Sequence, residues 1–270
     1  MAILAAIPGR AGQAQEQTKT MRLSLFLIAA TGLGCCTAVA PVCGQEKTAT
    51  AHRTVLELYT SQGCSSCPAA DALLRQYAHR PDILALTLPV DYWDYLGWKD
   101  TLADRKFSDR QRAYAKSLGH GTIFTPQVII DGRTDAVGSN RADIDKAVEQ
   151  AERAAAKVQV PIEIRPDSGF LIIKAAGHPQ AASAEKPATL WLVTLSKHVE
   201  VPIQRGENRG RTGIYTNVVR EIRSLGTWDG SPMTVRVADP KQEHPDVQGC
   251  AVLLQRHTTG PILGAALAQD

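Results

Sequence analysis

Two cysteines separated by two residues, Cys64 and Cys67, are the side chains in this sequence best suited to chemistry. A strand-like run at 54–59 precedes them, and a run with apolar residues at helical spacing, 70–77, follows them. A thiol at a helix N-terminus lies near free backbone N–H groups and the positive end of the helix dipole, which stabilise a thiolate. Because the thiolate is the reactive form in thiol–disulfide exchange, the pattern predicts a redox pair in which Cys64 attacks and Cys67 resolves.

Two other uses of the pair stay open at this level. A static disulfide would staple the start of the helix, although a loop this short gains little chain-entropy stabilisation. Two thiolates also suit Cu(I) or zinc, but such sites need further ligands, and the sequence has no second CxxC. His120 is the best third ligand, yet a lone histidine near a turn is more often a hydrogen-bonded loop residue. We therefore expect neither a metal site nor a cofactor.

The composition and net charge of the whole chain suit a soluble globular protein. Hydrophobic residues make up 44% of the 270 residues and charged residues 21%. The net charge of +3 is too small to indicate nucleic-acid binding, so we expect no nucleic-acid partner. A basic cluster surrounds a glycine-rich loop and is interpreted as a solvated charged surface; its members are Arg205, Arg209, Arg211, Arg220 and Arg223.

The N-terminal region predicts export. Residues 21–44 have a short basic start, an apolar core at 23–30 and small residues near Gly44, which is the pattern of a secretory signal peptide. The apolar core is too short for a membrane span, so we expect no stable span after cleavage. Residues 1–20 precede a second Met and are interpreted as a non-native upstream extension. The expected location is the periplasm or the exterior of a bacterial cell.

Export leaves three cysteines in an oxidising compartment. Cys35 and Cys36 invite a lipoprotein hypothesis, but the residues before them form no good lipobox, and both leave with the signal. One close pair and one odd cysteine do not make a structural disulfide framework. Cys250 lies in an apolar, strand-like run and is expected to be a buried, inert thiol.

The order of elements after the pair resembles the thioredoxin fold with helices inserted in the middle. A buried strand is predicted at 83–90, a helical region at 103–118, and a hairpin turn at 131–132 between strands at 128–130 and 134–137. A last helix is expected from an Asn140 cap to about 157. The comparison covers residues 53–157, within an expected domain at 45–157.

This resemblance implies roles for three further residues. The Thr125–Pro126 peptide bond is expected to be cis and to lie beside the redox pair, where the Thr125 backbone can pair with an extended peptide. Glu57 would be the buried acid below Cys67, with a raised pKa, and would accept the proton of that thiol. However, Glu57 lies seven residues before Cys64 instead of six, and one extra residue can turn a side chain to the other face. Both orientations of Glu57 stay open.

Residues 158–270 predict a smaller, β-rich and sandwich-like second domain. Apolar residues alternate with polar ones at 158–164, and further strand-like runs follow at 170–175, 190–195, 233–237 and 251–255. The predicted fold is therefore an α/β thioredoxin-like domain with a helical insertion, followed by this β-rich domain.

Three segments resemble the DUF1223 family, whose members are exported bacterial proteins. They are residues 57–68 around the CxxC, residues 90–98, and residues 206–208 together with 215–220. The resemblance implies a thioredoxin-like fold and export, but it supplies no settled substrate.

The leading interpretation is an exported thiol–disulfide oxidoreductase that acts on a protein or small-thiol disulfide and is recycled by an unidentified partner. The alternative is a non-catalytic, thioredoxin-like module that binds a partner or a metal and contains a structural disulfide. Exposure of Cys64 would discriminate between them.

Overall fold

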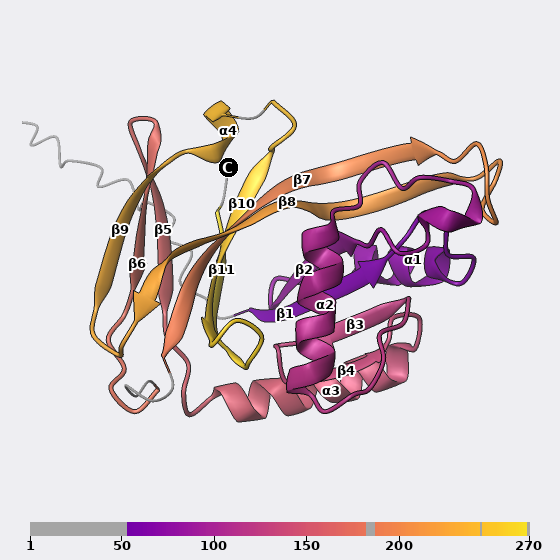
Figure 1. The fold of residues 1–270 in the computed structure, drawn as a ribbon. Coiled ribbons are helices and arrows are strands. Elements are labelled where there is room, and N and C mark those ends of the chain that lie inside the picture. Colours follow the sequence, from indigo (N-terminus) through magenta and orange to yellow (C-terminus); the bar gives the residue numbers. More distant parts are fainter. Residues whose placement is uncertain (1–52, 182–186, 244, 269–270) are drawn as a thin grey trace, which may run out of the picture. The chain divides into compact units, whose positions relative to one another are not determined.

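The computed structural model describes residues 53–181, 187–243 and 245–268 (Figure 1), so the predicted segments at 1–20 and 21–44 lie outside the described residues. The first half contains β1 (Thr54–Thr60), α1 (Cys67–Tyr77), β2 (Ile83–Pro89), η1 (Asp94–Leu96), α2 (Arg105–Ser117), β3 (Gln127–Ile130), β4 (Thr134–Val137) and α3 (Arg141–Ala155). The second half contains β5 (Ile162–Asp167), β6 (Phe170–Ala175), β7 (Ala188–Pro202), β8 (Thr212–Trp228), β9 (Met233–Ala238), α4 (Pro240–Glu243), β10 (Gly249–Arg256) and β11 (Ile262–Leu267). The fold is mixed α/β and dominated by strands, as the sequence predicts at this coarse level.

Eight strands form one sheet, in the order β11-β10-β7-β8-β2-β1-β3-β4. β1 runs parallel to β2, and α1 lies in the crossover connection between them. On its other side β1 pairs antiparallel with β3, which continues into β4 through a hairpin. β8 joins the sheet beside β2 at the register pair Thr87 and Val218. Strands from both halves of the chain therefore share one sheet.

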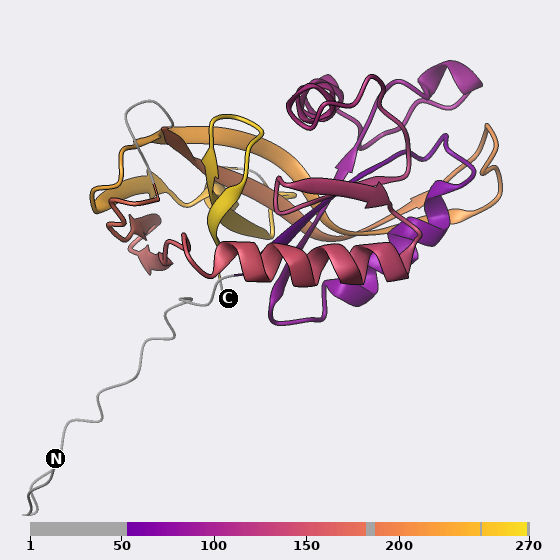
Figure 2. The same cartoon turned by 90° about the horizontal axis from the view of Figure 1, so that it is seen from below.

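Helices cover both faces of the sheet around β1 (Figure 2). Successive side chains of a strand point to opposite faces. Leu56 and Leu58 pack in the core formed with α1 and α3, whereas Val55 and Tyr59 pack in the core formed with α2. Every residue of β1 and β2 is consequently buried.

The second, three-stranded sheet has the order β5-β6-β9 and packs against the end of the large sheet that β7, β10 and β11 form. Its contact is an apolar cluster that includes Ile162, Ile173, Leu190 and Val252. The sequence analysis predicted neither β8 nor β11. In β8, buried and exposed positions do not alternate regularly, so this strand lacks the period-two pattern that predicts strands.

The β3–β4 turn packs against the β10–β11 loop, which belongs to the second half of the chain. Asp131 (φ 52°) and Gly132 (φ 63°) both adopt the left-handed conformation that such two-residue turns require. A Cβ atom on Gly132 would lie 2.1 Å from the carbonyl oxygen of Gly260, so only glycine allows this approach to the β10–β11 loop. The Ile262 amide donates to the Asp131 carbonyl oxygen (3.0 Å) beside it.

In the part of the chain that the structure describes, none of the helices has the length and apolar character that crossing a membrane requires.

Candidate functional site

The two predicted redox cysteines form a disulfide, with their Cα atoms 5.4 Å apart. Cys64 lies in the loop after β1, and α1 begins at Cys67 with Pro68 in its first turn, where a missing N–H costs no helical hydrogen bond. The Cys67 amide donates to the Cys64 carbonyl oxygen (3.3 Å). Cys67 is fully buried and Cys64 is only 4% exposed. The pair therefore lies at a helix N-terminus, but little of it is open to solvent.

A loop from the second half of the chain is hydrogen-bonded to the CxxC loop. This β7–β8 loop, residues 203–211, carries Asn208, whose side-chain amide donates to the carbonyl oxygens of Gln62 (3.0 Å) and Cys64 (2.8 Å). The Ser65 amide donates to the Glu207 carboxylate at 3.3 Å. Asn208 is itself buried. In the sequence, only the family resemblance of residues 206–208 indicates that this loop matters, and it does not predict that the loop contacts the CxxC loop.

Thr125 and Pro126 directly precede β3. Their peptide bond is cis, as expected. Trp93 connects this segment to the CxxC loop, because its indole N–H donates to the Thr125 hydroxyl (2.7 Å) while its backbone and Cβ lie against Gly63. Tyr95 stacks on Trp93 and is 76% exposed. Trp93 therefore links the predicted substrate-binding segment to the loop that carries the cysteines, with Tyr95 beside it.

Glu57 lies on the opposite face of the sheet from α1. Its carboxylate accepts hydrogen bonds from Arg110 Nε (2.7 Å), Arg110 Nη2 (3.2 Å) and the Tyr114 hydroxyl (2.5 Å), all from α2. Burial lowers the pKa of Arg110, but the Glu57 carboxylate together with the Tyr114 and Tyr59 hydroxyls outweighs burial and holds the pKa of this guanidinium above its ordinary value. Since α1 and Cys67 pack on the face that Leu56 and Leu58 line, Glu57 does not lie where the predicted proton acceptor of Cys67 has to be.

Two other carboxyl groups lie on the side of α1. Asp71 follows Cys67 by one helical turn, at the i,i+4 spacing that places two side chains next to each other. Burial raises the pKa of Asp71 to about 7, and the nearby Thr60 hydroxyl offsets only part of that effect. Burial likewise raises the pKa of Asp100 to about 6, although it accepts hydrogen bonds from the backbone amides of Gln62 (2.8 Å) and Leu102 (2.9 Å). Asp71 is not among the site residues predicted from the sequence, although its i,i+4 spacing from Cys67 on a predicted helix indicates that the two side chains are neighbours.

Neither His120 nor Cys250 joins the pair. His120 Nε2 lies 3.0 Å from the Asp135 carboxylate, which makes it a hydrogen-bonded loop residue. Cys250 is a free, fully buried cysteine, and burial raises the pKa of its thiol to about 11, which disfavours the reactive thiolate. Among the described residues, no three His, Cys, Asp or Glu side chains are grouped so as to hold a metal ion.

Replacing Asn208 with alanine is expected to lower the free energy of unfolding by about 2 kcal/mol, because the buried carbonyl oxygens of Gln62 and Cys64 lose their donor. Reduction of the disulfide by dithiothreitol should also become faster, since the loop over Cys64 is no longer held. Urea unfolding and timed alkylation measure the two effects. The control is Arg209→Ala, an exposed neighbour expected to change stability by less than about 0.5 kcal/mol. Wild-type stability and reduction rate in Asn208→Ala would contradict the proposed holding role.

Fold and site together define a mixed α/β protein with a nearly buried CxxC disulfide at the start of a helix. The chain belongs to the family described as "Protein of unknown function (DUF1223)", whose profile matches residues 55–255. No curated protein matches it. It is similar to the crystal structure of a structural genomics target from Agrobacterium tumefaciens, with 31% identity and a TM-score of 0.70 over 80% of this chain and 94% of that one. HBP35 of Porphyromonas gingivalis is similar in fold alone, with 10% identity and a TM-score of 0.56 over 82% and 76% of the two chains.

Proposed function

We propose that the chain is an exported thiol–disulfide oxidoreductase with a thioredoxin-like region at residues 53–157. The observation that carries the proposal is the Cys64–Cys67 disulfide at the N-terminus of α1, with the Thr125–Pro126 segment held near it through Trp93. The parallel β1–α1–β2 unit and the antiparallel β3–β4 hairpin support a thioredoxin-like arrangement. Export is proposed from the signal-like residues 21–44.

In the reducing direction, the Cys64 thiolate attacks one sulfur of a substrate disulfide, and the other substrate sulfur leaves as a thiolate. Cys67 then loses its proton and attacks Cys64 Sγ, which forms the Cys64–Cys67 disulfide and releases the second substrate thiolate. Two electrons pass from the pair to the substrate, and an external dithiol restores the reduced pair. We assign the proton of Cys67 to the Asp71 carboxylate, which lies one helical turn away and has a buried Oδ1 atom, in place of Glu57.

The low exposure of Cys64 favours a second candidate, a binding module with a structural disulfide. Cys64 is 4% exposed, and the Asn208 side-chain amide donates a hydrogen bond to its carbonyl oxygen. An attacking thiolate needs access to the substrate sulfur. In the oxidoreductase proposal, the β7–β8 loop therefore has to open during each reaction, whereas in a binding module it stays closed.

A redox titration separates the two candidates. The Cys250→Ser protein, which keeps the pair as its only cysteines after residue 44, is equilibrated in graded glutathione buffers, and free thiols are trapped with a mass-shifting alkylating agent. We expect a reversible two-electron transition of the pair. With Cys67→Ser added, Cys64 should accumulate as a mixed disulfide with glutathione. A native pair that stays oxidised in strongly reducing buffer but is reduced after unfolding would overturn the proposal and favour the binding module.

A further inference from the structure

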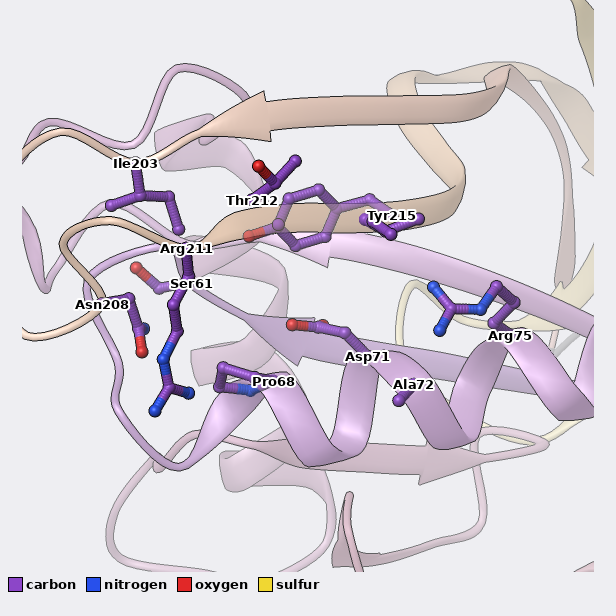
Figure 3. Close-up of a pocket in the computed structure, with 12 residues that line it drawn as sticks. Ser61, Pro68, Asp71, Ala72, Arg75, Ile203, Asn208, Arg211, Thr212 and Tyr215 are labelled. Carbon is purple, nitrogen blue, oxygen red and sulfur yellow. The ribbon is translucent and has the colours of Figure 1, made fainter.

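A pocket beside the CxxC loop belongs to neither half of the chain alone. Figure 3 shows it between α1 and β8, with the β7–β8 loop closing one end. Its polar lining comes from Ser61 after β1, Asp71 and Arg75 of α1, Asn208 and Arg211 of the loop, and Thr212 and Tyr215 of β8. Its volume is about 130 Å³. One water molecule needs about 10–15 Å³ by this kind of measure, so the pocket has room for a molecule of several non-hydrogen atoms.

Asp71 presents an acceptor atom without a partner in this pocket. Its Oδ1 atom is buried and accepts no hydrogen bond of ordinary geometry from a described residue; the Thr60 hydroxyl, which lowers the pKa of this carboxyl, is also without a bonded partner. Figure 3 shows the carboxyl group pointing from α1 toward the side of the pocket where Tyr215 lies. A buried polar oxygen without a donor costs about 1–3 kcal/mol, and more when it is charged. A ligand that donates a hydrogen bond here would remove that cost.

Two arginines line the same pocket without carboxylate partners. Neither Arg75 nor Arg211 forms an ion pair with a described residue, whereas Arg110 pairs with Glu57 and Arg220 with Asp246. Figure 3 shows the Asp71 carboxyl group between the two guanidinium groups along α1. A guanidinium group binds a carboxylate with two parallel hydrogen bonds, which gives geometric selectivity as well as affinity.

We propose that this pocket binds a small zwitterion of the α-amino acid type, with its ammonium group on Asp71 and its carboxylate on Arg211, at the end of the pocket that the β7–β8 loop closes. A simple anion would satisfy the arginines and leave Asp71 Oδ1 without a donor, and a simple amine would leave the arginines without an acceptor. An α-amino acid carries both charges a few bonds apart, which suits a pocket of this size. The site needs no reaction at the cysteines, so it stands or fails separately from the oxidoreductase proposal.

Calorimetric titration of the oxidised protein with glycine, L-alanine and L-serine tests this inference. We expect saturable binding of at least one of them, and at least about tenfold weaker binding of propionate and ethylamine, which each carry one of the two charges. Arg211→Ala should weaken amino-acid binding by at least about tenfold, because a carboxylate contact is lost. Arg209→Ala is the matched control, since this exposed arginine of the same loop does not line the pocket.

Three results would overturn the inference: no saturable binding of any of the three amino acids, equal binding of propionate, or equal affinity in Arg211→Ala. Arg211 is exposed, so its replacement should leave the thermal unfolding midpoint unchanged and the binding result interpretable. Because the cysteines stay oxidised throughout, a failed redox titration would not affect this result.

Discussion

Glu57→Gln is expected to lower the free energy of unfolding by about 3 kcal/mol. The change keeps the shape of the side chain and removes the charge that compensates Arg110, whose side chain is 10% exposed. An uncompensated buried charge costs about 3–5 kcal/mol. Urea unfolding at pH 7 measures the difference from wild type.

Two comparisons show whether the loss comes from burial of the ion pair. Asp109→Asn breaks exposed pairs with Arg112 and Arg105, in which every side chain is at least 49% exposed, and should cost less than about 1 kcal/mol. The double change Glu57→Gln with Arg110→Leu should recover part of the loss, because no unpaired charge stays buried. If Glu57→Gln and Asp109→Asn cost the same, Glu57 is not the buried partner that its contacts indicate.

Asp71→Asn should slow the resolving step by about 100-fold at pH 7, the lower end of what a positioned general base contributes. A chromogenic aromatic disulfide separates the steps, because attack by Cys64 releases the first coloured thiolate and resolution by Cys67 releases the second. In the wild-type protein the second rate should rise with pH through about 7, the pKa of Asp71. In the variant it should continue to rise toward about 8.5, the ordinary pKa of a thiol.

The same variant gives a stability test with a definite sign. Burial raises the pKa of Asp71 above its unfolded value, so the folded state binds more protons and this carboxyl stabilises the fold most at low pH. That contribution is lost as the pH rises from about 4 to about 7. Asp71→Asn should therefore be more stable than wild type at pH 8, and this advantage should shrink toward pH 4.

Unfolding thus cannot explain a slower resolving step in Asp71→Asn. Glu57→Gln is the control for the kinetics, because its carboxyl group lies on the far face of the sheet and should leave the second phase unchanged. A wild-type second phase in Asp71→Asn, with the same dependence on pH, would remove Asp71 from the mechanism. A slow second phase in Glu57→Gln would return that role to Glu57.

Sequence reasoning succeeded where a structure depends on neighbouring residues. The CxxC lies at a strand–helix junction, Asp131 and Gly132 make the predicted turn, and the Asn140 side chain caps α3 by accepting from the Asp143 amide. Each feature rests on a backbone conformation or a cap that a few adjacent residues determine. These elements therefore appear in the structure with nearly their predicted bounds.

Contacts between distant segments were not predictable from the sequence. Asn208 binds the Cys64 carbonyl oxygen across 144 positions, and β8 pairs with β2 although its own sequence lacks a clear strand pattern. The orientation of Glu57 depended on one residue of spacing, which reverses a side chain in a strand. The sequence places Asp71 four residues after Cys67, but no local pattern shows that burial raises the pKa of its carboxyl group.

The β7–β8 loop, whose Asn208 bonds to Cys64, lies late in the sequence, and this has a consequence for how the protein is made. Ribosomes synthesise the amino-terminal part first, at about 5–20 residues per second. Asn208 follows Cys64 by 144 positions, so roughly 7–30 seconds of synthesis separate them at that rate. For this interval the nascent chain contains both cysteines and no loop to cover them. In the oxidising compartment to which export is proposed, an oxidant has its easiest access to these thiols while residues 203–211 have not yet packed against the CxxC loop.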